Sequence, residues 1–129
     1  AHGQTAADSA AIVETALNYI EGWYEGDGDR MRSALHPQLA KRIVQTNPET
    51  GVSELGDMSA ATLIGATQRA FGTQTPAERQ QKDVTILDIY RSAAVVKIVA
   101  ADWIDYLQVG KFNGEWVIIN VLWEMKPRG

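Results

Sequence analysis

The segment from residue 115 to residue 125 is apolar on both faces of a strand, and this feature constrains the fold most. Asn113-Gly114 before it is the strongest short hairpin signal, so residues 115–125 are predicted to form the last strand of a sheet. One face carries Trp116, Ile118, Asn120 and Leu122, and the other carries Val117, Ile119, Val121 and Trp123. Helices can cover only one face, so the other needs a different cover. The sequence therefore predicts a homodimer packed sheet to sheet through Val117, Ile119 and Val121.

The first half of the chain has helical spacing. Apolar residues between Ile12 and Tyr24 form a stripe that predicts a helix, with Thr5 to Asp8 as a possible capping box. Gly26-Asp27-Gly28-Asp29 ends this helix, and either aspartate can cap a short second one.

The next stretch mixes turn and helix signals. Pro37 disfavours helical geometry at the residue before it, so a turn is expected there. Leu39 and Ile43 indicate another helical turn before a loop at residues 46–51, and Ser59 is a good N-cap for a third helix.

After Lys82 the hydrophobic period changes from helical to extended. Strands are predicted at residues 84–90, at residues 94–112 and at the final segment. Helices followed by a meander of strands indicate an α+β domain, with the helices packed on one face of the sheet. We expect a flexible tail at residues 1–9 and a single domain at residues 10–129.

Charge and composition exclude several partners. The 129 residues carry a formal net charge of −4 and no basic stripe, so we expect no nucleic-acid partner. No apolar run approaches the ~20 residues that a membrane helix needs. We expect no membrane partner and a cytoplasmic location, and a leader removed before Ala1 stays open as an alternative.

No complete catalytic signature is present. The chain has no Gly-rich phosphate loop, no Gly-x-Ser-x-Gly elbow and no His-Glu-x-x-His. The absence of cysteine excludes thiolate catalysis, and His2 and His36 alone cannot build a zinc site. We therefore expect no metal and no cofactor, and whether the protein is an enzyme stays open.

Two kinds of titratable residue stand out as candidates for chemistry. His36 lies at a break between helices, where it could act as a base or a hydrogen-bond donor in a cleft, or could cap the turn at Pro37. Asp102 and Asp105 are three residues apart on a strand, so they point to opposite faces and one should point inward. An inward carboxylate with a raised pKa would suit a general base, whereas an edge carboxylate would reach solvent.

Aromatic residues recur in both halves of the chain and suit a pocket for a flat or apolar ligand. The alternative for each aromatic is an ordinary place in the hydrophobic core. We take His36 and Asp105 as candidate catalytic residues. The candidate ligand-binding residues are Tyr19, Trp23, His36, Trp103, Asp105, Tyr106, Trp116 and Asn120.

Several segments together resemble a known family. They read Tyr19-Ile-Glu-Gly-Trp-Tyr-Glu-Gly-Asp27, Leu35-His36-Pro37-Gln-Leu39-Ala40-Lys41-Arg42, Met58-Ser59, Asp105-Tyr106-Leu107, and Lys111-Phe-Asn-Gly-Glu-Trp-Val-Ile-Ile-Asn-Val-Leu-Trp123. From about Ala10 to Lys126 the chain is similar to the putative lumazine-binding family of the nuclear transport factor 2-like superfamily. The resemblance implies a cone-shaped α+β domain, with a curved antiparallel sheet wrapped around helices, a pocket at the wide end, and frequent dimers.

The superfamily includes steroid isomerases, dehydratases, cyclases and non-catalytic carriers, so the fold alone does not assign an activity. Tyr19 corresponds to the oxyanion-hole tyrosine of the steroid isomerases. Their carboxylate base has no counterpart, because the matching stretch reads Ala40-Lys41-Arg42-Ile43. This departure argues against steroid-isomerase chemistry.

Our leading interpretation is a dimeric pocket protein that binds a small flat or apolar molecule. One alternative is an enzyme of isomerase, dehydratase or cyclase type, in which His36 and Asp105 handle the proton and Tyr19 donates to a developing oxyanion. The other is a dimeric interaction module whose pocket is filled by its own side chains.

Overall fold

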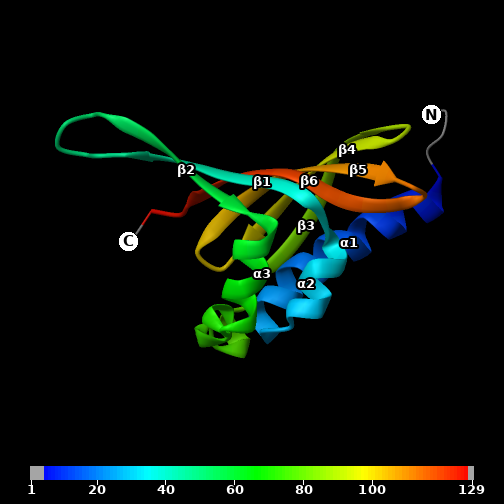
Figure 1. The fold of residues 1–129 in the computed structure, drawn as a ribbon, viewed down its shortest axis with the longest axis horizontal. Coiled ribbons are helices and arrows are strands. Elements are labelled where there is room, and N and C mark those ends of the chain that lie inside the picture. Colours follow the sequence, from blue (N-terminus) through cyan, green and yellow to red (C-terminus); the bar gives the residue numbers. More distant parts are fainter. Residues whose placement is uncertain (1–4, 128–129) are drawn as a thin grey trace.

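The computed structural model describes residues 5–127, in which helices cover one face of a curved six-stranded sheet (Figure 1). The helices are α1 (Ala6–Glu25), α2 (Gly28–Ala34) and α3 (Ala60–Gln68), followed by the short 3-10 turns η1 (Phe71–Gln74) and η2 (Ala77–Arg79). The strands are β1 (Leu35–Thr46), β2 (Ser53–Ser59), β3 (Lys82–Tyr90), β4 (Ala93–Ala100), β5 (Trp103–Phe112) and β6 (Glu115–Met125). The strand order is β2-β1-β6-β5-β4-β3. The predicted α+β class, with helices on one face, is confirmed.

Helix α1 begins and ends at local signals in the sequence. Thr5 is its N-cap, because Thr5 Oγ1 accepts a hydrogen bond from the Asp8 N–H at 3.0 Å. Gly26 ends it with a left-handed backbone, at φ 70°, that glycine adopts without strain. The helix begins within the segment expected to be a tail, of which residues 1–4 lie outside the described part.

The helical turn predicted around Leu39 and Ile43 is wrong, because residues 35–46 form strand β1. Pro37 keeps the chain extended, and β1 pairs in parallel with β6 and antiparallel with β2. The sheet is therefore mixed and not antiparallel throughout. Leu39 and Ile43 are four residues apart, which suits one face of a helix. The buried residues are instead Leu39 and Lys41, which are two apart, as on one face of a strand.

The single strand predicted at residues 94–112 is two strands. Strands β4 and β5 pair antiparallel, so the chain reverses at Ala101 and Asp102 without glycine or proline. Contacts from distant residues hold this turn: the Ala101 N–H donates to Tyr24 Oη at 3.0 Å, and the Lys126 N–H donates to the Asp102 carbonyl at 2.8 Å.

A bulge in β6 exchanges the faces of the last strand. Gln108 pairs with Asn120 and Val109 pairs with Ile118, so Ile119 has no partner across the ladder. Before the bulge Trp116 and Ile118 point toward the helices, as expected. After it Val121 is 3% exposed and buried in the core, whereas Asn120 and Leu122 lie on the outer face. The inward orientation predicted for Asn120 and the outward one for Val121 are both wrong, because one extra residue inverts the alternation.

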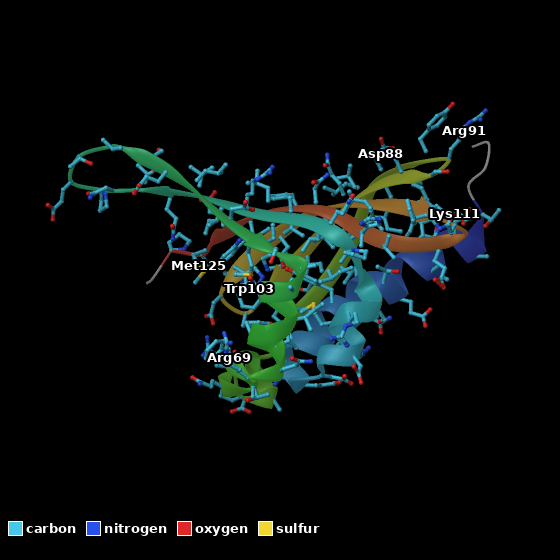
Figure 2. All side chains as sticks on the ribbon, in the orientation of Figure 1. Arg69, Asp88, Arg91, Trp103, Lys111 and Met125 are labelled. Atoms are coloured by element: carbon cyan, nitrogen blue, oxygen red, sulfur yellow. The ribbon has the colours of Figure 1, made fainter. Side chains whose placement is uncertain are left out.

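The core lies between the helices and the inner face of the sheet (Figure 2). At the end near the start of α1, Asp8 joins helix to sheet. Its Oδ1 accepts from Trp116 Nε1 at 3.1 Å and from Lys111 Nζ at 3.2 Å. Thr15 Oγ1 donates to the Trp116 carbonyl at 2.8 Å. Trp103 lies at the opposite end of β5 from Lys111, where the site described below is found (Figure 2).

Replacing Asp8 by Asn should destabilise the protein in a pH-dependent way. The hydrogen bond from Trp116, and then that from Lys111, lowers the pKa of Asp8. The stabilisation is therefore complete above the unfolded-state pKa, ordinarily 3.8, and is lost as the pH falls through the folded-state pKa. Urea unfolding should show a gap between wild type and Asp8→Asn at about pH 7 that closes in acid.

Glu14→Gln is the matched control, because Glu14 is exposed on the same helix and its carboxylate pairs with none of residues 5–127. It should leave the unfolding free energy near that of the wild type. A gap for Asp8→Asn that is the same at every pH would contradict the ion-pair account.

Candidate functional site

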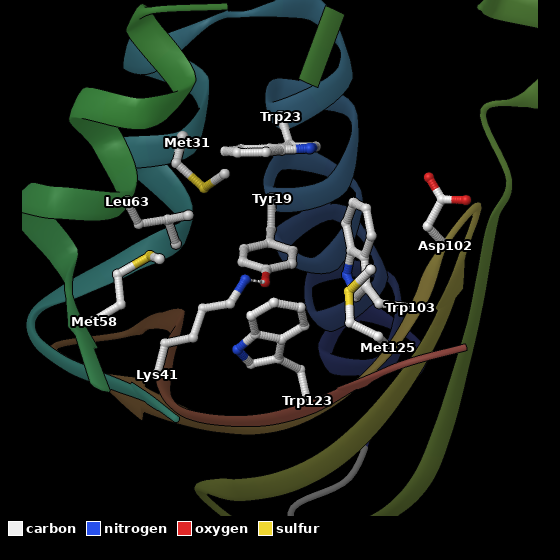
Figure 3. A pocket seen from close by; sticks show the side chains of 10 residues that line it. All are labelled: Tyr19, Trp23, Met31, Lys41, Met58, Leu63, Asp102, Trp103, Trp123 and Met125. Atoms are coloured by element: carbon white, nitrogen blue, oxygen red, sulfur yellow. Dashed lines mark hydrogen bonds between the residues drawn. The ribbon is translucent and has the colours of Figure 1, made fainter. Parts of the chain in front are cut away.

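A cavity of about 250 Å³ opens between the three helices and the sheet (Figure 3). Most of its walls are aromatic or thioether side chains. The residues that line it are Tyr19, Trp23, Met31, Lys41, Met58, Leu63, Asp102, Trp103, Trp123 and Met125. They come from α1, α2 and α3 and from strands β1, β2, β5 and β6, so the cavity is assembled from segments far apart in the sequence.

The local sequence explains how the walls are placed. Tyr19 and Trp23 are four apart on α1 and so lie on the same side of the helix. The rings of Trp23 and Trp103 meet edge to face at 6.4 Å between centroids, and those of Trp103 and Trp123 at 6.5 Å. Three tryptophans thus form a continuous aromatic wall.

Lys41 and Tyr19 form the polar floor of the cavity (Figure 3). Lys41 Nζ donates to Tyr19 Oη at 2.6 Å, and the two residues are only 7% and 2% exposed. The same ammonium lies 5.1 Å from the centroids of the Tyr19 and Trp123 rings. Burial lowers the pKa of Lys41, although the negative charge of Asp105 opposes that shift.

Asp105 lies behind this floor and is 0% exposed. Its Oδ2 accepts from Trp103 Nε1 at 2.7 Å, and its Oδ1 accepts no hydrogen bond from the described residues. Burial raises the pKa of Asp105, while Lys41 and then the Trp103 hydrogen bond act in the opposite direction. Burial and the Asp105 charge together raise the pKa of Tyr19 well above its usual range. In each of these three residues, burial favours the uncharged form of the side chain.

Chemically, this arrangement offers an amine and a phenol to a molecule surrounded by aromatic rings. Both groups can hydrogen-bond an oxygen of the ligand. Asp102 lies apart, with its carboxylate directed away from Lys41, and its Oδ1 accepts from Arg79 Nη2 at 3.2 Å. Of the two aspartates, Asp105 is therefore the inward one.

The structure brings together half of the predicted ligand-binding residues. Tyr19, Trp23 and Trp103 line the cavity, and Asp105 supports its floor. Trp116 is buried at the far end of the core beside Asp8. Tyr106 and Asn120 are exposed on the outer face of the sheet, and the Asn120 amide donates to Gln108 Oε1 at 3.0 Å.

His36 does not share the cavity with Asp105. It lines a separate surface hollow beside Pro37. Its Nδ1 accepts from the Gln38 N–H at 3.0 Å, and its ring meets Phe112 edge to face at 4.7 Å. His36 therefore bonds the neighbouring backbone within strand β1, and the acid–base pairing of His36 with Asp105 is not formed.

Lys41 is the main site residue that the sequence interpretation missed. Residues 39–43 were assigned to a helical turn, so no face could be given to Lys41. The available signal was its place in the stretch Ala40-Lys41-Arg42-Ile43, where the resemblance to the steroid isomerases implies a carboxylate and the sequence has none.

The comparisons with known proteins agree with this fold. The family described as putative lumazine-binding matches residues 7–124. No curated protein is similar enough in sequence to be matched.

Three solved structures are similar to the chain. A nuclear transport factor 2-like protein of unknown function from Shewanella baltica has a TM-score of 0.72 at 20% identity, covering 97% of this chain and 99% of that one. Another such protein, from Methylobacillus flagellatus, has a TM-score of 0.69 at 19% identity, covering 96% of each chain. A ketosteroid isomerase-like protein from Erwinia carotovora atroseptica has a TM-score of 0.66 at 11% identity, covering 96% of this chain and 100% of that one. At these identities the likeness shows the fold alone.

Replacing Trp103 by Phe should leave Asp105 Oδ2 without its indole donor. An unpaired buried acceptor costs about 1–3 kcal/mol. Trp123→Phe is the control, since it removes similar volume from the same cavity and its indole N–H donates to none of residues 5–127. Denaturant unfolding at about pH 7 should therefore show a larger loss for Trp103→Phe by that amount. Equal losses would mean that the hydrogen bond contributes nothing net.

Proposed function

Because this chain belongs to the putative lumazine-binding family of the nuclear transport factor 2-like superfamily, we propose that it binds a small flat organic molecule in the cavity above Lys41 and Tyr19. The observation that carries this proposal is the aromatic wall around a buried amine and phenol. Cavities of this kind combine apolar walls with a few placed polar groups.

The walls and floor indicate which ligands fit. Trp23, Trp103 and Trp123 offer ring faces and edges to a planar molecule. Lys41 Nζ and Tyr19 Oη suit a carbonyl or other oxygen at one end of it. A lumazine-like bicyclic ring with carbonyl groups meets both requirements. A volume of about 250 Å³ favours a ligand of that size over a larger one.

The same geometry bears on the two alternatives. An interaction module with a filled pocket is disfavoured by the open cavity. Acid–base catalysis by His36 and Asp105 is disfavoured because His36 lies in another hollow.

No helix within residues 5–127 has the length and hydropathy needed to cross a membrane.

Filling the cavity should abolish binding. A thermal-shift screen of pterins, flavins and steroids should find a class that stabilises the wild type, by about 2.7 kcal/mol at 100 times the dissociation constant. Met58→Trp places an indole in the cavity and should remove that stabilisation. Leu55→Trp is the control, because Leu55 is exposed on the same strand and outside the cavity. Stabilisation that survives Met58→Trp would place the ligand elsewhere.

We also propose a homodimer through the outer face of the sheet, which the helices leave uncovered. The face differs from the one expected at the outset. Val117 and Ile119 remain on it, Val121 does not, and exposed Leu122 and Tyr106 join them. A two-fold axis would pair this face with itself.

Leu122→Lys should convert the dimer to a monomer, because it puts a charge into the centre of the buried face. The side chain is 51% exposed in the single chain, so the fold should tolerate the change. Val52→Lys, on the exposed β1–β2 turn, is the control and should remain a dimer. Sedimentation velocity at micromolar concentration measures both, and a wild-type protein that sediments as a monomer would refute the dimer.

A further inference from the structure

Lys41 is in an unusual position for a lysine. Its Nζ faces an apolar cavity and donates to one group, Tyr19 Oη, within residues 5–127. No carboxylate of those residues lies within 4.0 Å of it. Lys82 and Lys111, by contrast, form ion pairs with Glu21 and Asp8. Lys41 is therefore a buried amine without a close counter-ion.

Burial favours the neutral, nucleophilic form of the Lys41 amine, although the charge of Asp105, more than 4.0 Å away, acts in the opposite direction. Taking an ammonium out of water is costly, so desolvation shifts the equilibrium toward the free base. Each unit by which a lysine pKa falls raises the fraction of free amine at neutral pH about tenfold. Lysines desolvated in apolar pockets are known to attack carbonyl carbons.

Tyr19 is placed to handle the proton that such an attack requires. Its Oη lies 2.6 Å from Lys41 Nζ, so it is within reach of an oxygen bonded to the carbon that Nζ attacks. The rings of Tyr19 and Trp123, each 5.1 Å from Nζ, would stabilise a positive charge that forms on the nitrogen.

We propose that Lys41 forms an imine with a flat aromatic or conjugated aldehyde or ketone bound in the cavity. The Nζ lone pair forms a C–N bond while the carbonyl π pair moves to oxygen. The oxygen takes up one proton and the nitrogen gives up one, which yields a neutral carbinolamine. That hydroxyl leaves as water after protonation, and loss of the N–H proton gives the imine. Amine and carbonyl are converted to imine and water, with no oxidant or reductant. This chemistry rests on the ligand site described under Proposed function.

Reductive trapping tests the proposal. The wild-type protein is incubated with 2-naphthaldehyde and sodium cyanoborohydride, and intact mass and peptide mapping locate the reduced adduct. We expect the adduct on Lys41 to form first, ahead of an adduct on any other lysine. Mapping on the wild type needs no variant to fold.

Matched variants sharpen the result. Lys41→Met should abolish the rapid adduct. Lys97→Met should leave it unchanged, because Lys97 lies on the outer face, with its Nζ 6.0 Å from the centroid of the Tyr106 ring. Tyr19→Phe should slow trapping at Lys41 while the adduct remains on the same residue.

A ligand analogue without a carbonyl group tests ligand binding in the cavity separately from imine formation at Lys41. 2-Naphthylmethanol cannot form an imine, but it should occupy the cavity, raise the melting temperature and slow trapping at Lys41. Stabilisation by the alcohol without a Lys41 adduct, or labelling spread evenly over surface lysines, would overturn the imine and leave binding intact. If the alcohol does not stabilise the protein and no Lys41 adduct forms, both imine formation and ligand binding in the cavity are overturned.

Discussion

The bulge at Ile119 is the constraint on which the rest of the structure depends. Without the extra residue, the alternation of β6 would turn Val121 and Trp123 away from the helices. With it, Trp116 closes one end of the core, and Trp123 closes the cavity at the other. A single strand thereby contributes to the core, the site and the outer face.

The second determinant is the buried cluster of Lys41, Tyr19 and Asp105. These three side chains come from β1, α1 and β5, so the cluster ties the helical layer to the sheet. Buried charges of this kind rarely add net stability, because desolvation offsets their attraction. Stability alone therefore does not account for an amine at this position, whereas the ligand binding and imine formation proposed above would.

Local features could be predicted from the sequence, and features that depend on strand partners could not. Thr5, Gly26 and Ser59 act at helix ends as their chemistry indicates, and Asn113-Gly114 forms the last hairpin. The family and the helix-on-sheet class followed from segments spread over the whole chain. Strand β1 was missed because its place in the sheet depends on its parallel partner β6, which lies far from it in sequence. The turn at Ala101 and the bulge at Ile119 carry no residue that marks them.

The candidate site shows the same division. Tyr19, Trp23 and Trp103 were chosen because aromatic residues recur in both halves of the chain, and Asp105 because one of two nearby aspartates should point inward. All four lie in or behind the cavity. Asn120 was misplaced by the bulge and Lys41 by the error in β1. The outward position of Tyr106 follows from ordinary alternation once Asp105 is known to point inward.

The placement of the tryptophans has an optical consequence. Of the four in the chain, Trp23, Trp103 and Trp123 surround the cavity and Trp116 alone lies elsewhere in the core. The indole emission of the protein therefore originates mainly at the site. A bound planar chromophore would accept excitation energy from three donors at contact distance, so occupancy would be visible in the intrinsic fluorescence without any added label.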